Sequence, residues 1–234
     1  GQTLQFYVPL YVSNYCTNAC RYCGFNRRSD VRRRALSLDE AAAEARHLSN
    51  QGFRHLLLVS GEDPVHAPVS YFEELVRRVR HWFASISIEI YPLSLEEYRR
   101  LIHAGVDGLT LYQETYDRGI YASVHEAGGK RDFDRRLRAI EEGAAAGMQT
   151  LGIGALLGLR SWRLEAFALG LHARHLRRRY WRQRLAVSFP RLRQAEGAIA
   201  PPHPVDDRAL VQMICALRLF LPDTELVLST RESP

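Results

Sequence analysis

Long hydrophobic runs, cysteine and lysine are all scarce in this chain of 234 residues. No run approaches the roughly eighteen apolar residues that a membrane-spanning helix requires, so we expect no membrane segment. The first residues, GQTLQFYVPLYV, lack the basic leader of a secretory signal. The four cysteines, three of them clustered, do not fit the disulfide framework of a secreted protein, and we expect a cytoplasmic one.

Lys130 is the only lysine, so arginine carries nearly all of the basic charge behind the net charge of +6. The densest basic runs are VRRR at 31–34 and RHLRRRYWRQR at 174–184. A basic balance can indicate a nucleic-acid or acidic partner. Solvated helix or loop faces explain both runs more simply, and we therefore expect no nucleic-acid partner.

Two stretches, 36–62 and 93–114, share one pattern. Each opens with Ser followed three residues later by Glu, the capping box of a helix start, and each helix ends at a Gly. A short apolar run follows, and polar residues come directly after it. A third copy runs from FDRRLRAIEEGAAAG into MQTLGIGALLG. The capping and terminating residues are Ser37, Glu40 and Gly52 in the first stretch and Ser94, Glu97 and Gly105 in the second.

The apolar runs are nearly continuous, as in strands of a parallel sheet that is buried on both faces. Seven of them alternate with helices, and no linker interrupts the chain, which predicts a single domain over residues 1–234. The predicted fold class is α/β, one strand short of a (β/α)8 barrel. The predicted strands are Phe6–Ser13, His55–Ser60, Ser85–Ile90, Gly108–Gln113, Thr150–Leu156, Leu185–Phe189 and Glu225–Ser229.

Chemistry in a parallel barrel lies at the carboxyl ends of the strands. Three cysteines follow the first predicted strand, and SGEDP, YQETY, GIGALLG, SFPRLR and STRES follow later ones. Functional-looking residues thus fall at the same end of strand after strand. Alternation along the first strand predicts a barrel-lining face of Tyr7, Pro9, Tyr11 and Ser13 and a helix-facing one of Phe6, Val8, Leu10 and Val12.

The clustered cysteines, Cys16, Cys20 and Cys23, form the pattern CxxxCxxC. A zinc site usually takes four protein ligands, and a catalytic nucleophile needs only one cysteine. Cys215 lies far off in an apolar helical pattern, where we expect a buried core thiol. Three thiolates without a fourth suit a 4Fe–4S cluster with one open iron. A three-cysteine zinc site completed by a histidine is the alternative.

With an aromatic residue, Tyr22, before its last cysteine, the triad resembles that of the radical S-adenosylmethionine (SAM) enzymes. The resemblance covers essentially the whole chain. PLYVSNYCTNACRYCGF, LLLVSGED, LYQETY, GIGALLGL, VSFPRLR and LSTRESP are similar to segments of the aromatic amino acid lyases in that superfamily. SFPRLR and IYPLSLEEY lean toward the tyrosine lyase of thiamine biosynthesis, and GEDPVHAPVSYF toward that of FeFe-hydrogenase maturation.

This resemblance implies a 4Fe–4S cluster whose open iron binds SAM and whose electron cleaves it to methionine and a 5′-deoxyadenosyl radical. In the tyrosine lyase, the radical oxidises L-tyrosine, and the Cα–Cβ bond breaks to give p-cresol and 2-iminoacetate. Thiazole synthase is the expected protein partner, and reduced flavodoxin or ferredoxin is the expected electron donor. A tyrosine lyase of the FeFe-hydrogenase-maturase type, a tryptophan lyase and a non-catalytic cluster- or zinc-binding scaffold are the alternatives.

The family pattern further implies that the chain is a fragment without an N-terminal extension and a last strand. In that case the first and seventh strands present unpaired edges.

The resemblance also assigns roles around SAM. Gly61 and Glu62 stand in the place of a Gly-Gly-Glu segment whose backbone meets the methionine amino group, although Ser60 replaces the first glycine. A simple turn after a strand is the alternative. Glu114 ends a strand, where a buried carboxylate needs a cationic or hydroxyl partner. We expect it to face the ligands and to take part in catalysis.

Arg136 resembles the arginine that pairs with the cofactor carboxylate, with Arg135 and Arg138 as close rivals. Gly152 and Gly154 lie on a glycine-rich strand that resembles the one beside adenine, although close packing also explains such glycines.

For the substrate, we expect Arg231 to bind the tyrosine carboxylate, because a guanidinium matches a carboxylate in two parallel hydrogen bonds. Tyr11 is expected to touch the substrate amine, with barrel packing as the alternative.

Overall fold

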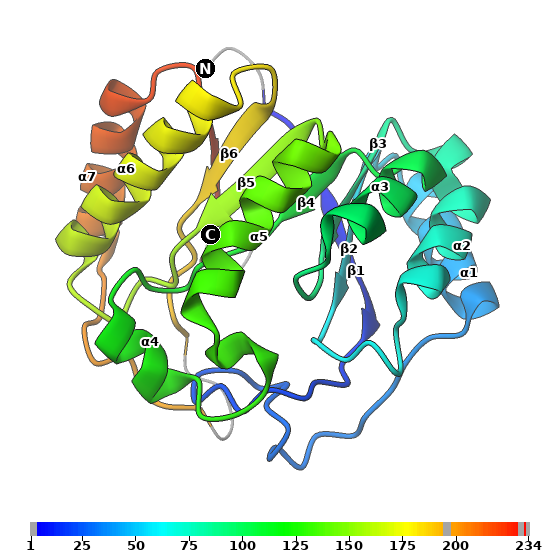
Figure 1. The fold of residues 1–234 in the computed structure, drawn as a ribbon, viewed down its shortest axis with the longest axis horizontal. Coiled ribbons are helices and arrows are strands. Elements are labelled where there is room, and N and C mark those ends of the chain that lie inside the picture. The colour runs from blue at the N-terminus through cyan, green and yellow to red at the C-terminus, as the bar shows by residue number, and fades with distance from the viewer. Residues whose placement is uncertain (1–3, 194–197, 229–231, 233–234) are drawn as a thin grey trace.

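The structure is a computed structural model that describes residues 4–193, 198–228 and 232. Its seven strands form one parallel sheet in the order in which they follow along the chain (Figure 1). Within the described residues, β1 pairs only with β2 and β7 only with β6, so the barrel is open between them. The strands are β1 (Val8–Ser13), β2 (His55–Ser60), β3 (Ser85–Glu89), β4 (Gly108–Thr110), β5 (Thr150–Gly154), β6 (Arg184–Ser188) and β7 (Glu225–Val227).

Helices connect successive strands, and most of them pack on the outer face of the curved sheet (Figure 1). The α/β fold and the incomplete barrel predicted from the sequence are thereby confirmed. None of the helices in the described part is both long and apolar enough to cross a membrane. The helices are α1 (Leu38–Asn50), α2 (Val69–Val79), α3 (Leu95–Ala104), α4 (Arg118–Val124), α5 (Phe133–Ala146), α6 (Trp162–Arg179) and α7 (Asp207–Phe220), with short 3-10 helices η1 (Arg80–Trp82) and η2 (Gly129–Arg131).

The predicted capping boxes start α1 and α3. Each N-cap serine side chain accepts a hydrogen bond from the backbone N–H of the glutamate three residues on, and the carboxylate of that glutamate accepts one from the N-cap backbone N–H. Gly105 ends α3 with a φ of 118°, in the left-handed region where a residue with Cβ is strained. These local signals determine where the helices begin and end. They thereby determine where the carboxyl end of each connected strand lies.

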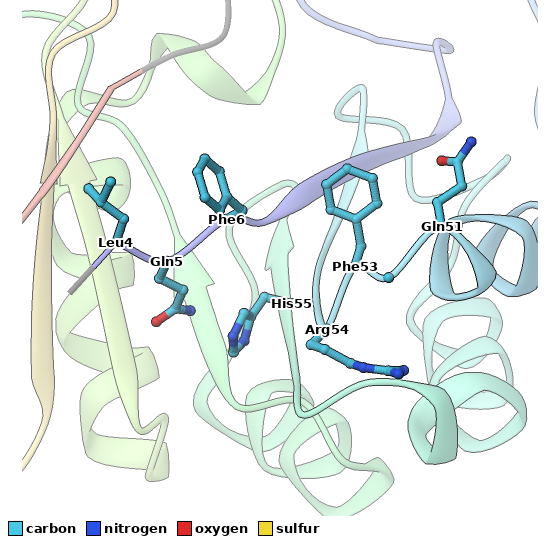
Figure 2. Close-up of a pocket in the computed structure, with 8 residues that line it drawn as sticks. Leu4, Gln5, Phe6, Gln51, Phe53, Arg54 and His55 are labelled. Atoms are coloured by element: carbon cyan, nitrogen blue, oxygen red, sulfur yellow. The ribbon is translucent and has the colours of Figure 1, made fainter.

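The helix-facing side of β1 is as predicted at Leu10 and Val12, which are buried in the core. Phe6 is a correction. It precedes the strand and is 74% exposed, so it does not pack against the helices as predicted. Its ring lines an open pocket of about 430 Å³ with Phe53 and His55 at the amino end of β2 (Figure 2). This pocket lies at the end of the barrel opposite the cysteines.

Cys215 is also a correction, because its side chain is exposed. The buried face of α7 is formed by Leu210, Met213 and Leu217, and Cys215 lies on the opposite side of the helix. An apolar helical spacing therefore identified the helix correctly but not which of its faces the sheet covers.

Candidate functional site

The site is built on the segment between β1 and α1, residues 14–36, which we call the cysteine loop. The cysteine loop lies against the carboxyl end of β2. The backbone N–H and the hydroxyl of Thr17 both donate to the Glu62 carbonyl, at 3.1 and 2.9 Å. A Cβ on Gly61 would lie 2.2 Å from the carbonyl oxygen of Tyr15. Residue 61 must therefore be glycine for the cysteine loop to approach this closely.

A second wall comes from the segment that joins α4 to η2. Cys20 and His125 form an antiparallel bridge, which places the cysteine loop and the end of α4 edge to edge. Gly128 has a φ of 90°, and a Cβ there would lie 2.2 Å from the Asn18 side-chain oxygen. Both glycines thus permit backbone to close around the three cysteines. In Figure 1 this segment and the cysteine loop lie together at the lower edge of the barrel.

The cysteines occupy one shared environment. Burial raises the pKa of Cys20 to about 12. The charge of the nearby Lys130 ammonium works against this rise, and the charge of Cys23 adds to it. Burial also raises the pKa of Cys23, which lies close enough to Cys16 to feel its charge. The N–H of Phe25 points at the Cys23 sulfur, with a distance of 3.4 Å. In the described ranges, no three His, Cys, Asp or Glu side chains are already arranged to hold one metal ion.

Beside the cysteines lies a cluster of four buried charges: two carboxylates, an ammonium and a guanidinium. Arg136 donates to Glu62 at 2.6 Å, and its other terminal nitrogen lies 3.8 Å from Glu114. The Lys130 ammonium donates to Glu114 at 2.6 Å. Asn18 of the cysteine loop completes the link, because its amide donates to Glu62 at 2.8 Å and its side-chain oxygen accepts the Lys130 backbone N–H at 2.9 Å.

These four groups keep each other charged. Burial by itself would raise the pKa of Glu62 and Glu114, but Arg136 and Lys130 hold both pKa values below the ordinary range. Burial likewise opposes the charge of Lys130, and the carboxylates overcome it and raise its pKa. Glu114 also has a φ of 70°, a strained value for a residue with Cβ. The site therefore holds fixed charges of both signs at a place that is largely withdrawn from water.

An aromatic group closes the cluster on one side. His125 donates from Nδ1 to the Tyr121 carbonyl at 2.8 Å, so its Nε2 accepts the Tyr22 hydroxyl at 2.7 Å. Burial lowers the pKa of His125 to about 4, which keeps the ring neutral near pH 7. The Tyr121 hydroxyl donates to the Lys130 carbonyl at 2.6 Å. These contacts hold Tyr22 in place, and Tyr22 lies between Cys20 and Cys23 in the sequence.

Two tyrosines lie near Glu89: Tyr7 just before β1 and Tyr112 just after β4. Burial of the rings, together with the charge of Glu89, raises both of their pKa values. A Cβ on Gly154 would lie 2.7 Å from the Tyr112 ring, and one on Gly152 would lie 2.6 Å from a threonine hydroxyl of β4. Close packing therefore accounts for both glycines, and their contact with adenine stays a prediction.

The structure brings most of the sequence-predicted residues together. Arg136 is buried inside the charge cluster, whereas its rivals Arg135 and Arg138 are exposed, which separates the preferred arginine from its two close rivals. Tyr11 is 46% exposed and meets the Phe25 ring edge-on, so it reaches the cysteine loop from the strand. Arg231 lies outside the described residues. The residues that converge are Cys16, Cys20, Cys23, Tyr22, Gly61, Glu62, Glu114 and Arg136.

Three polar residues of this site were missed from the sequence: Asn18, His125 and Lys130. Lys130 offered a signal, because it is the only lysine in a chain that otherwise uses arginine. Asn18 and His125 offered none. Each acts through a partner more than a hundred positions away along the chain.

The sequence of this chain matches known protein families and curated proteins. The family model described as the radical SAM superfamily matches residues 10–168, and that of the Biotin and Thiamin Synthesis associated domain matches residues 188–234. The chain is 44% identical to 2-iminoacetate synthase of Escherichia coli (strain K12) over 235 residues, which cover 100% of this chain and 62% of that protein. It therefore spans less than two thirds of the length of this relative.

Solved structures of other proteins have the same fold. The FeFe-hydrogenase maturase HydG from Carboxydothermus hydrogenoformans has a TM-score of 0.92 and 36% identity, covering 97% of this chain and 54% of that one. Methylornithine synthase (PylB), at 24% identity and a TM-score of 0.78 over 94% of this chain and 63% of that one, shares the fold. Members of the matched superfamily use a 4Fe–4S cluster and SAM. The match over residues 10–168, which contains the CxxxCxxC triad and the charge cluster, shows that the chain belongs to the radical SAM superfamily.

Proposed function

We propose that this chain is the barrel of a radical SAM tyrosine lyase of the 2-iminoacetate synthase type. It would cleave L-tyrosine at Cα–Cβ to p-cresol and 2-iminoacetate, which a thiazole synthase would use in thiamine biosynthesis. The observation that carries the proposal is the convergence of three cysteines with four buried charges at the carboxyl ends of β1, β2 and β4. Full-chain identity of 44% to 2-iminoacetate synthase supports the choice of reaction.

The donor set fits the cofactors. Cys16, Cys20 and Cys23 supply three soft thiolates, and an iron–sulfur cluster held by three cysteines keeps one iron open. Lys130 would favour the thiolate forms, because its charge lowers the pKa of both Cys20 and Cys23. When bound, the cluster and SAM would supply a one-electron cleavage that yields the 5′-deoxyadenosyl radical.

The charge cluster fits the zwitterionic end of SAM. Arg136 and Lys130 are the cations available to its carboxylate, and Glu62 and Glu114 are the carboxylates available to its ammonium or ribose. Because these side chains already hold each other, they are oriented before the cofactor arrives. Such pre-organisation lowers the entropy cost of positioning reacting groups.

Substrate binding is proposed for the barrel interior. Tyr11 projects from β1 toward Phe25 of the cysteine loop and lies near Tyr7. Arg231 is proposed to bind the tyrosine carboxylate through its planar guanidinium. The expected electron donor is reduced flavodoxin or ferredoxin, and the expected location is the cytoplasm.

The test is an anaerobic assay of the full-length gene product, reconstituted with iron and sulfide and supplied with SAM, a reductant and one aromatic amino acid. Tyrosine should give p-cresol together with 5′-deoxyadenosine and methionine. An indole acid from tryptophan instead of p-cresol from tyrosine would transfer the protein to the tryptophan lyases. A protein that takes up zinc but no iron or sulfide would leave only the scaffold alternative.

The HydG likeness favours a second candidate, a tyrosine lyase of the hydrogenase-maturase type. Both candidates cleave tyrosine, so the assay above does not separate them. Growth of a thiazole-requiring bacterial strain without added thiazole, after introduction of the full-length gene, would favour the thiamine role. Maturation of an FeFe-hydrogenase in a strain that lacks its own maturase would favour the second.

A further inference from the structure

The basic run VRRR does not behave as one solvated face. Arg32 and Arg34 are exposed, and Arg34 pairs with Glu40 at 2.9 Å. Arg33 turns the other way, into the cysteine loop, and is partly buried. Within the described residues, no carboxylate pairs with it, so backbone carbonyl groups meet its charge.

Four carbonyl oxygens surround the Arg33 guanidinium. One terminal nitrogen donates to Asn14 at 2.6 Å and to Phe25 at 2.9 Å. The other donates to Asn26 at 2.5 Å and to Ser29 at 3.4 Å. Asn14 precedes the first cysteine and the other three acceptors follow the last one. A single side chain therefore ties together the two ends of the segment that carries the triad.

Phe25 connects this tie to a sulfur. Its carbonyl accepts from Arg33, and its N–H points at Cys23 Sγ at 3.4 Å. Hydrogen bonds to ligand sulfurs are among the factors that set the reduction potential of an iron–sulfur cluster. A change at Arg33 should therefore reach the cluster through the orientation of residue 25.

We propose that Arg33 is a positioning residue that holds the cysteine loop closed and directs the Phe25 N–H at the Cys23 sulfur. The second half of this statement rests on the proposed function, since it presumes that Cys23 binds the cluster. Lysine could not replace Arg33 in this role. The two terminal nitrogens of the planar guanidinium reach all of these carbonyl oxygens together, and a single ammonium cannot.

The first half is tested on the metal-free protein by timed maleimide labelling and peptide mass spectrometry. Arg33→Gln should label the buried Cys20 about tenfold faster, a factor that corresponds to about 1.4 kcal/mol of local opening. Exposed Cys215 should label at the wild-type rate and serves as the internal control. Arg32→Gln, which loses an exposed charge of the same run, is the matched variant and should label as wild type. Wild-type labelling of Cys20 in Arg33→Gln would overturn the proposal.

The second half is tested on the reconstituted protein by redox titration followed with electron paramagnetic resonance. Arg33→Gln should lower the cluster potential, Arg33→Lys should lower it less, and Arg32→Gln should leave it at the wild-type value. An unchanged potential in a fully loaded Arg33→Gln variant would overturn the link through Phe25. Wild-type protein that takes up no cluster would refute the proposed function instead, while the labelling experiment would still decide the loop-closing role.

Discussion

At the carboxyl ends of β1, β2 and β4, charged side chains are buried against one another, whereas along α6 most of them lie at the surface and only Glu165 among the described residues is buried. Glu62 and Arg136 are 14% and 6% exposed in their side chains and meet at 2.6 Å. Arg177 of α6 and Asp223 are 36% and 79% exposed and meet at 3.3 Å. The chemical groups are alike, but only the first pair is withdrawn from water, and a buried charge that loses its partner is costly.

This difference teaches where the chain uses its charge for function. The buried charges surround the three cysteines and connect the cysteine loop to β2, β4 and α5. The surface charges of α6 face water or form local pairs, such as that of Arg177 with Asp223. Four predictions test the contrast, from the largest expected effect to the smallest.

Replacing Cys16, Cys20 or Cys23 by alanine should abolish the cluster and all deoxyadenosine formation, because each thiolate is proposed to bind a different iron. Cys215→Ala is the matched control and should retain both, since that thiol is exposed on the outer side of α7. Iron and sulfide content after anaerobic reconstitution is the measurement. Full deoxyadenosine production without any one of the three cysteines would refute the cluster assignment.

Particular residues show how much of the fold and of the site could be predicted from the sequence. Periodicity and capping boxes predicted the strand order and the starts of α1 and α3, since those signals depend on neighbours within four positions. The contacts of Lys130 and Arg33 depend on how distant segments meet. The exposed Cys215 shows the same limit, because periodicity marks an apolar helix but not which face the sheet covers.

Arg136→Met should lower the free energy of unfolding of the metal-free protein by about 3–5 kcal/mol, the usual cost of leaving a buried charge without its partner. Glu62 loses its guanidinium, and Glu114 keeps Lys130 as its ion-pair partner. Urea unfolding followed by circular dichroism measures the loss. Arg178→Met on exposed α6 is the control and should change stability by less than about 0.5 kcal/mol. Equal losses in the two variants would remove the contrast between the two regions.

His172 is, with the buried Glu165, an exception on α6, because burial lowers the pKa of His172 to about 4. Its Nδ1 shares a hydrogen bond with the Tyr116 hydroxyl, and its buried Nε2 has no partner in the part of the chain described. An unfolded histidine titrates near pH 6.5, so between pH 6.5 and 4 the unfolded chain binds the extra proton. Stability should therefore fall by roughly 3 kcal/mol as the pH drops through that window.

The measurement is the urea midpoint of the wild type and of His172→Gln at several pH values. The variant cannot take up the proton, so its midpoint should fall less steeply between pH 6.5 and 4. Parallel profiles would show that His172 titrates normally and that burial on α6 is weaker than the structure indicates.

The smallest effect is expected for the surface pair of Arg177 with Asp223. Exposed ion pairs contribute little, because water screens both charges and ordering two flexible side chains costs entropy. Arg177 also lies in the last turn of α6, where a cation is favourable by itself, so single substitutions overstate the pair. A double-mutant cycle with Arg177→Ala and Asp223→Ala isolates the coupling, which should stay below about 0.5 kcal/mol and vanish in 1 M salt. A salt-resistant coupling above about 1 kcal/mol would mean that the α6 surface is organised like the charge cluster beside the cysteines, and the contrast between the two regions would fail.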